Sequence, residues 1–214
     1  MTIPAPHPLV IAVDGPAASG KGTIARALAA HYELPHMDTG LLYRAVALNL
    51  TRWGGDPGNE FEALRACDRA GVSPDDPDLR SEIVGEVASR ISAYPSVRAA
   101  LLERQQAFAA QPGGAVLDGR DVGTVIAPAA AVKLFVTASP EIRARRRTEE
   151  LLASGRRVHF DDVLTDIRAR DRRDGGRDAA PLQRAEDAVL LDTGEMSRDE
   201  AIRAAIALVE RKRG

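Results

Sequence analysis

The sequence predicts an α/β fold with three layers, in which helices cover both faces of a five-stranded parallel sheet. Two observations support this class. Five short apolar runs alternate along the chain with amphipathic stretches of helical period, which is typical of parallel strands joined by helices. A glycine-rich turn also joins the first apolar run directly to the first helical stretch.

The apolar runs define the expected strands in chain order. They are Leu9–Asp14, Leu34–Met37, Ala115–Asp118, Val132–Thr137 and Ala188–Asp192. The second run is the weakest strand candidate, because it has only four residues. Helices are expected at about Gly20–His31, Gly40–Thr51, Ser96–Ala110, Ser139–Ala153, Phe160–Asp171 and Ser197–Lys212.

Two of these helices have clear start signals. Ser139 is followed by Pro140, which combines an N-cap residue with proline at the first helical position. Ser197 and Glu200 have the spacing of a capping box, in which each side chain bonds to the other residue's backbone N–H.

Two segments interrupt the alternation of strands and helices. Residues 52–90 are mostly acidic, with nine carboxylates against five arginines, and are interpreted as an inserted lobe. Residues 143–177 have eleven arginines against seven carboxylates. No central apolar stripe is visible in this second segment, which is therefore expected to form an exposed, mobile excursion.

The composition is that of a globular protein. The chain has 214 residues, is 44% hydrophobic and has a formal net charge of −2, a balance that excludes disorder and fits one large domain. The near-neutral total argues against binding to nucleic-acid polymers. With no visible apolar stripe for an interface, a monomer is expected.

Nothing in the chain indicates a membrane or secreted protein. No apolar run reaches the roughly 20 residues that a membrane span needs. The N-terminal apolar stretch Leu9–Val13 is too short for a secretory signal. The single cysteine, Cys67, excludes an internal disulfide framework and fits a reducing cytoplasm, where the protein is expected.

The glycine-rich turn has the composition of a phosphate-binding loop. Its residues are Gly15, Pro16, Ala17, Ala18, Ser19, Gly20, Lys21, Gly22 and Thr23. Glycines let the backbone wrap around phosphates, the helix start adds partial positive charge, and Lys21 can reach the β- and γ-phosphates. Lys21 is also one of only three lysines among 29 basic residues. The strand–loop–lysine–helix context predicts a nucleoside triphosphate site.

The end of this loop narrows the class of protein. Gly22 separates Lys21 from Thr23, a variant common in nucleotide kinases that leaves open whether Thr23 contacts Mg²⁺ directly. The guanine-binding run Asn-Lys-x-Asp of GTPases is absent from the sequence. The length leaves little room for the long regulatory elements of a switch or motor protein.

Two further polar runs follow the second and third expected strands. They are Asp38-Thr39-Gly40-Leu41-Leu42-Tyr43-Arg44 and Asp118-Gly119-Arg120-Asp121-Val122-Gly123-Thr124. Ligands bind at the carboxyl ends of strands in open parallel sheets. Arginine contacts phosphate in bidentate fashion, and a carboxylate can accept a hydrogen bond from the 4-amino group of cytosine. A second anion site is therefore expected beside the phosphate loop.

Taken together, these runs resemble the bacterial cytidylate kinases. The matching runs are Asp14-Gly15-Pro16, Gly20-Lys21-Gly22-Thr23, Asp38-Thr39-Gly40, Tyr43-Arg44, Asp118-Gly119-Arg120-Asp121, Gly123-Thr124, Tyr94-Pro95-Ser96-Val97-Arg98, Arg170-Asp171-Arg172-Arg173-Asp174, Arg177 and Ala180-Pro181-Leu182. The resemblance covers nearly the whole chain, in order. It implies a P-loop NTPase-type fold and phosphoryl transfer from ATP, with Mg²⁺, to CMP or dCMP.

The resemblance also implies a domain organisation. The core would comprise about residues 1–51, 91–153 and 178–214. The insert that binds the nucleoside monophosphate would lie at about 52–90, and a helical lid at about 154–177.

Roles for individual residues follow from the same resemblance. It implies that the acceptor phosphate is bound by Arg44, Arg120 and Arg177, cytosine by Ser89, Arg98 and Asp121, and the sugar hydroxyls by Arg170 and Asp174. Thr39, which stands where serine is also common, and Tyr43 are also expected to bind the substrate, with Tyr43 lining the acceptor pocket. The expected catalytic residues are Lys21, Arg120, Arg173 and Arg177. No direct metal ligand is expected, and the four histidines are scattered.

Other lid arginines are less certain ligands. Arg143, Arg147, Arg156 and Arg157 are candidates for contact with the transferring phosphoryl group, alongside the favoured Arg173. About half of these five are expected to be surface charges that pair with nearby carboxylates at helical spacings. No general base is expected, because the acceptor phosphate is itself mostly ionised at neutral pH.

Two alternatives stay open. One is a nucleoside-monophosphate kinase with a different base, such as UMP, although a carboxylate at Asp121 would repel the uracil O4 atom. The other is a regulatory protein that binds ATP without efficient transfer. The second group of arginines and aspartates argues against it, because a sensor of ATP alone needs no second phosphate site.

Overall fold

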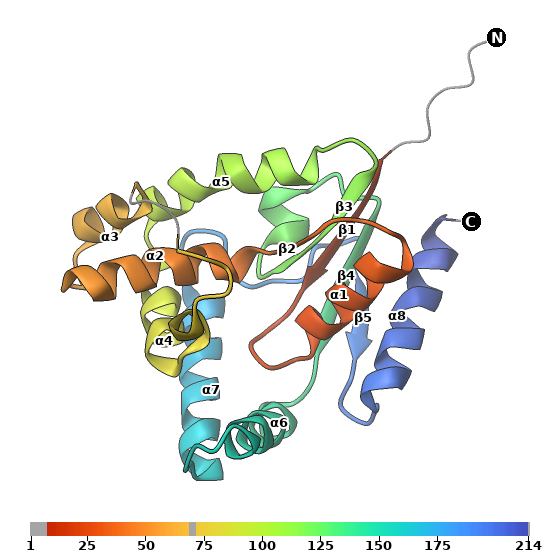
Figure 1. Cartoon of the computed structure of the whole chain (residues 1–214). Coiled ribbons are helices and arrows are strands. Elements are labelled where there is room, and N and C mark those ends of the chain that lie inside the picture. Colours follow the sequence, from red (N-terminus) through yellow and green to blue (C-terminus); the bar gives the residue numbers. More distant parts are fainter. Residues whose placement is uncertain (1–7, 69–71, 214) are drawn as a thin grey trace.

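The structure is a computed structural model that describes residues 8–68 and 72–213. Residues 1–7, 69–71 and 214, which belong to the expected core and insert, lie outside the described residues. A five-stranded, all-parallel sheet with the order β2-β3-β1-β4-β5 lies at the centre (Figure 1). The strands are β1 (Leu9–Asp14), β2 (His36–Asp38), β3 (Gly114–Gly119), β4 (Val132–Thr137) and β5 (Val189–Asp192). The predicted α/β class is thus confirmed.

All six predicted helices are present, with small shifts at their ends. The α-helices are α1 (Lys21–His31), α2 (Thr39–Trp53), α3 (Glu60–Cys67), α4 (Glu82–Ile91), α5 (Pro95–Ala109), α6 (Pro140–Ala153), α7 (Phe160–Gly176) and α8 (Arg198–Arg213). Two short elements are a 3₁₀ turn, η1 (Pro77–Arg80), and a π-helical turn, η2 (Val122–Ile126). Helix α7 continues beyond the predicted end at Asp171.

Strand β2 begins two residues later than predicted. The backbone N–H of Leu34 bonds to the carbonyl of Ala29 and so belongs to the end of α1. Pro35 has no N–H to donate to a neighbouring strand. Only its carbonyl joins β3, by accepting from Val116 at 2.9 Å, so regular pairing starts at His36.

The two faces of the sheet are covered by different helices. On one face, Leu28 of α1 and Ala205 of α8 pack against Ile11 and other strand residues. On the other face, Ala109 of α5 and Val122 of η2 pack in the cluster that contains strand residues such as Leu117. The sheet thus lies between two helical layers, and the carboxyl ends of its parallel strands lie at one edge (Figure 1).

A helical lobe extends to one side of the sheet and has a core of its own (Figure 1). Helices α2, α3 and α4, the turn η1 and the start of α5 enclose buried side chains that include Leu50, Leu79, Ile91 and Val97. Asparagine and serine N-caps begin α3 and α4. The lobe therefore packs by apolar burial even though its surface is acidic.

Helices α6 and α7 pack against one another below this lobe (Figure 1). Their contact buries Ala144, Leu151, Val163 and Ile167. The interpretation that this arginine-rich segment lacks an apolar stripe was therefore wrong. The stripe is short and divided between two helices, at spacings of seven residues on α6 and four on α7, so neither helix shows it clearly alone.

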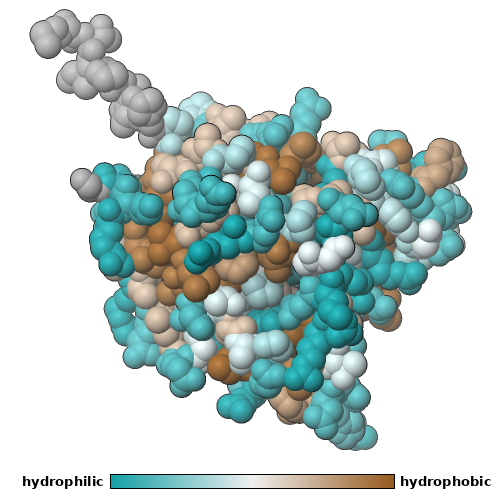
Figure 2. Space-filling view, turned by 180° about the vertical axis from the view of Figure 1, so that it is seen from behind, coloured by the Kyte–Doolittle hydropathy of each residue, from teal (hydrophilic) through white to brown (hydrophobic). Residues whose placement is uncertain are grey.

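The surface is largely polar. Figure 2 shows mostly hydrophilic side chains on the face turned towards the viewer, with hydrophobic ones gathered over one part of it. Within residues 8–68 and 72–213, none of the helices combines the length and the apolar character that crossing a membrane would require.

Gly15 lies where the end of β1 passes very close to β4. A Cβ atom at Gly15 would lie 2.1 Å from the carbonyl oxygen of Val136. We expect Gly15→Ala to lower the free energy of unfolding by about 1–3 kcal/mol, the usual cost of overpacking, measured by urea denaturation. Gly175→Ala is the matched control, because a Cβ there meets no atom within 4 Å. Equal unfolding midpoints for the two variants would contradict the close approach.

Candidate active site

A cavity of about 900 Å³ opens beyond the carboxyl ends of β1, β2 and β3. Its walls come from the loop before α1, from α2, α4, α6 and α7, and from the segment after β3. The predicted residues that line it are Ala17, Ala18, Ser19, Gly20, Lys21, Gly22, Thr23, Thr39, Tyr43, Arg44, Ser89, Arg98, Arg120, Asp121, Arg170, Arg173, Asp174 and Arg177. Gly15 and Pro16 are not among the lining residues.

The loop between β1 and α1 has an unusual backbone conformation, and side chains from other elements form hydrogen bonds to its carbonyls. Ala18 has a φ of 58° and Gly20 a φ of 87°, both in the left-handed region that non-glycine residues seldom adopt. Arg143 donates to the carbonyl of Ala17 at 3.2 Å, and the hydroxyl of Thr193 shares its proton between the carbonyls of Ser19 at 3.2 Å and Thr137 at 3.1 Å. In a trans peptide the next N–H points the opposite way. The N–H groups that follow these carbonyls are therefore available to an anion.

Lys21 is the first residue of α1 and lines the cavity. Burial and the guanidinium of Arg120 lower the pKa of Lys21 to about 8, against the opposing effect of the carboxylates of Asp118 and Asp38. Within the described chain its ammonium group donates no hydrogen bond and forms no ion pair. A half-buried cation that forms no ion pair favours the binding of an anion.

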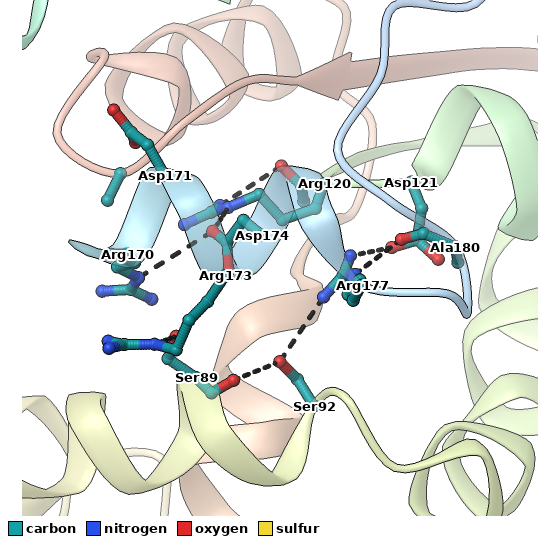
Figure 3. Close-up of polar contacts among 12 residues, drawn as sticks. Ser89, Ser92, Arg120, Asp121, Arg170, Asp171, Arg173, Asp174, Arg177 and Ala180 are labelled. Atoms are coloured by element: carbon teal, nitrogen blue, oxygen red, sulfur yellow. Dashed lines mark hydrogen bonds and ion pairs between the residues drawn. The ribbon is translucent and has the colours of Figure 1, made fainter. Parts of the chain in front are cut away.

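Two of the predicted arginines meet the carboxylate of Asp174 on α7 (Figure 3). Arg120 donates its Nε–H to Oδ2 of Asp174 at 2.7 Å, and Nε of Arg170 lies 4.0 Å from the same oxygen. Burial alone would raise the pKa of Asp174, but the two arginines outweigh it and hold that pKa below its usual range. Burial and Arg120 lower the pKa of Arg170 to about 10. Two guanidinium groups thus share one carboxylate, which leaves net positive charge.

A second arginine group surrounds Asp121. Arg98 of α5 forms an ion pair with Oδ2 of Asp121. NH2 of Arg177 lies 4.0 Å from Oδ1 of the same carboxylate (Figure 3). The Arg98 guanidinium also lies 5.7 Å from the centre of the Tyr43 ring. Burial raises the pKa of Asp121, against the effect of these arginines. An acceptor carboxylate beside an aromatic ring can bind a flat heterocycle that carries an amino group.

Serine side chains of α4 and of the turn after it link this wall of the cavity to α7. Arg173 donates its Nε–H to the hydroxyl of Ser89 at 3.3 Å, and Arg177 donates to the hydroxyl of Ser92 at 3.4 Å (Figure 3). Ser89 is therefore a buried residue of the cavity wall, and Ser92 is a neighbour that the sequence did not single out.

Arg44 and Thr39 line the cavity but also hold the surrounding backbone. NH1 of Arg44 donates to the carbonyls of Leu79 at 3.1 Å and Ser81 at 3.0 Å, in the helical lobe. The hydroxyl of Thr39 donates to the carbonyl of Asp118 at 2.8 Å. Arg44 has further N–H groups for a ligand, whereas the hydroxyl proton of Thr39 is already used.

Two buried carboxylates had not been assigned a role. Asp14 accepts hydrogen bonds from the backbone N–H groups of Val122 at 2.8 Å and Gly123 at 2.7 Å, and burial raises its pKa to about 6. Oδ1 of Asp118 lies 2.8 Å from Nε2 of His36. Both aspartates stand inside the motif runs described above, so their position at strand ends was the available signal.

The lid arginines considered from the sequence divide into two groups. Arg147, Arg157 and Arg173 line the cavity, whereas Arg143 and Arg156 do not. Arg147 forms ion pairs with Glu150 on its own helix at 2.6 Å and with Glu82 on α4. The second of these pairs joins α6 to the helical lobe.

Comparison with known proteins agrees with this arrangement. The family model described as cytidylate kinase matches residues 11–211. A cytidylate kinase of Xanthobacter autotrophicus is 58% identical over 96% of this chain and 99% of its own length, and one of Azorhizobium caulinodans is 53% identical over 96% and 100%.

A solved structure supports the fold independently. The crystal structure of an uncharacterized protein from Eubacterium ventriosum has a TM-score of 0.55 and 14% sequence identity, and the match covers 94% of this chain and 98% of that one. At this identity the likeness concerns the fold alone. The family match and the relatives establish that the chain belongs to the cytidylate kinase family.

Proposed function

We propose that the protein transfers the γ-phosphoryl group of ATP to CMP and dCMP. The observation that carries this proposal is that one cavity contains two separate anion sites. Lys21 and the phosphate loop form one, and the arginine groups around Asp121 and Asp174 form the other. A protein that only binds ATP has no need for the second site. Membership of the cytidylate kinase family supports the same reaction.

The phosphate loop would bind ATP. Its backbone N–H groups, the start of α1 and the ammonium group of Lys21 all favour negative charge. Because Arg143 and Thr193 hold two of the loop carbonyls away from the cavity, the donors are already oriented before the nucleotide arrives. This arrangement lowers the cost of ordering the loop upon binding.

The other walls would bind the monophosphate. We assign the acceptor phosphate to Arg44, Arg120 and Arg177, cytosine to Ser89, Arg98 and Asp121, and the sugar hydroxyls to Arg170 and Asp174. Tyr43 offers its ring to the base beside Arg98, and Thr39 fixes the turn that precedes it. In this arrangement the carboxylate of Asp121 accepts a hydrogen bond from the 4-amino group of cytosine.

The transfer itself requires charge neutralisation rather than a general base. A phosphate monoester has a second pKa near 6, so the acceptor oxygen is already mostly ionised. Two anions must approach in line, and we assign their neutralisation to Lys21, Arg120, Arg173 and Arg177. Arg173 has a hydrogen bond to Ser89 at 3.3 Å, which it can exchange for one to the transferring group.

We further propose that ATP binds together with Mg²⁺. Oxygen donors of the kind that this ion prefers lie near Lys21, namely the carboxylates of Asp38 and Asp118 and the hydroxyl of Thr23. Among the described residues no three His, Cys, Asp or Glu side chains form a metal-binding group. The ion would therefore be held mainly by nucleotide oxygens and water, where it would neutralise phosphate charge.

The helical regions around the cavity fit separate roles in binding the monophosphate and in closing the site. We propose that residues 52–90 form the monophosphate-binding insert and 154–177 the lid, on a core of 1–51, 91–153 and 178–214. The hydrogen bond from Arg173 of α7 to Ser89 of α4 supports a lid that meets the insert, and the pair Arg147–Glu82 joins the adjoining core helix α6 to the same insert. Such closure would exclude water and limit wasteful hydrolysis of ATP. We place the enzyme in the cytoplasm, as a monomer.

A substrate panel tests the function. With ATP and Mg²⁺, release of ADP should be fast with CMP and dCMP and at least tenfold slower with UMP, AMP or GMP. Equal turnover of UMP would defeat the assignment of the base. ATP binding without turnover of any monophosphate would favour a regulatory protein instead.

The pKa of Lys21 predicts a pH-dependent uptake of protons. At pH 8.5 the lysine is mostly neutral in the free protein, because its pKa is about 8. Bound phosphates raise that pKa, so ATP binding should take up most of a proton at pH 8.5 and little at pH 6.5. Calorimetry in buffers of different ionisation enthalpy measures the number of protons taken up per ATP bound. Lys21→Met should abolish the difference between the two pH values, and equal uptake by both proteins would contradict the assignment.

A further inference from the structure

The guanidinium group of Arg143 joins three separate parts of the chain. Its side chain is only 3% exposed and lies at the start of α6. It donates from Nε to the carbonyl of Ala138 at 2.9 Å, and from NH1 to the carbonyl of Ala17 at 3.2 Å. NH1 and NH2 also form a two-point ion pair with Asp171, at 3.0 and 2.6 Å. These contacts occupy most of its donors, so Arg143 is not available to contact a phosphoryl group.

The contact with Ala17 acts on the phosphate loop. The peptide that follows Ala17 is trans, so its N–H, that of Ala18, points away from Arg143. Ala18 lines the cavity and has a φ of 58°, which an alanine adopts only when its surroundings impose it. The guanidinium therefore helps to hold one donor of the loop in the orientation that an anion requires.

The contact with Asp171 acts on α7. Asp171 leaves the helix on a different side from Arg173, which reaches towards Ser89 on α4 (Figure 3). A two-point ion pair restrains rotation of the helix about its axis more than a single hydrogen bond does. Because side chains are fixed at 100° intervals around a helix, this restraint also sets the directions of Arg170 and Asp174.

We propose that Arg143 is a positioning residue that couples the phosphate loop to α7, so that one guanidinium sets the binding groups for both nucleotides. The inference rests on the proposed function for the identity of the two ligands. Because a single guanidinium contacts both the phosphate loop and α7, binding of one nucleotide should increase the affinity for the other. The coupling is reciprocal, as linkage requires.

The test measures how an ATP analogue changes the affinity for CMP. The dissociation constant of CMP is determined by calorimetry with and without a non-hydrolysable ATP analogue and Mg²⁺. We expect the analogue to tighten CMP binding at least about fivefold in the wild type. Asp171→Asn, which keeps the size of the side chain and removes its charge, should reduce this factor below twofold. Arg143→Lys should do the same and also weaken the analogue alone several-fold, because the contact with Ala17 is lost.

Arg168→Lys is the matched control. Arg168 of α7 pairs with Glu141 of α6 at 2.6 Å, so it joins the same two helices, but on an exposed surface away from the loop. In this variant the ATP analogue should tighten CMP binding by the same factor as in the wild type. Absence of coupling in the wild type, or its retention in Asp171→Asn, would overturn the proposal. A wild type that binds the analogue but not CMP would instead defeat the proposed function, and analogue binding by Arg143→Lys would still test the loop contact.

Discussion

Lys21→Met should lower kcat with ATP and CMP by about 10³-fold. Methionine has a similar length and no charge, so the change removes the ammonium group and little else. Single positioned donors and cations at a transition state contribute about 10²–10⁵ in rate. Lys21 is half-buried and forms no ion pair within the described chain, so its ammonium group is available to the phosphates. Steady-state assay of ADP release measures the loss.

A buried lysine outside the cavity provides the control. Lys133 of β4 is 8% exposed and donates to Asp187 at 2.9 Å, and it does not line the cavity. Lys133→Met should lower stability while kcat stays within about twofold of the wild type. Equal losses of kcat in both variants would show that a buried ammonium group matters only for the fold.

Asp121→Asn should remove the preference for cytosine. Asparagine fills the same space but presents an N–H₂ donor on one side, so it can face the O4 of uracil as well as the amino group of cytosine. Arg98 and Arg177 also lose the negative charge between them. We expect kcat/KM for CMP to fall by about 10²-fold or more, because buried polar groups left unpaired are costly in recognition. The ratio of kcat/KM for CMP and UMP should approach one.

Arg44→Ala distinguishes base recognition from phosphate binding. Arg44 lies on α2 and is assigned to the phosphate that all monophosphates share. Loss of Arg44 should lower kcat/KM for CMP and for UMP by the same factor. The ratio of the two kcat/KM values should therefore stay that of the wild type. An unchanged ratio in Asp121→Asn, or a changed one in Arg44→Ala, would reverse these roles.

Local sequence features predicted the strands and the fold well. Strands β1 and β4 have the bounds expected from their apolar runs, since each run ends in a polar residue, Asp14 or Thr137. The phosphate loop was equally clear, because it depends on a short run of small residues around Lys21. The helices α3 and α4 of the acidic segment had no counterpart in the predicted elements, since their apolar faces are short and separated by turns.

Pairings between distant residues could not be predicted. Asp14 and Val122 are 108 positions apart and form a buried hydrogen bond, and Arg120 and Asp174 are 54 apart and form a part-buried ion pair. The composition shows that arginines are abundant, but it does not show which guanidinium groups are available to a ligand and which are used in contacts within the protein. The enclosure of Arg143 appears only when α6, α7 and the phosphate loop are brought together.

The hydrogen bonds of Asp14 have a consequence for how this enzyme can change over time. They join the end of β1, from which the phosphate loop starts, to Val122 and Gly123, directly after Asp121. The distance between the proposed ATP and monophosphate sites is therefore fixed by hydrogen bonds between segments at the ends of β1 and β3. Of the residues that we assign to the base, Asp121 adjoins these segments, whereas Ser89 on α4 and Arg98 on α5 lie outside them. On these assignments, a substitution at Arg98 would adjust the contacts to the base without touching the hydrogen bonds of Asp14 that fix the distance between the two sites.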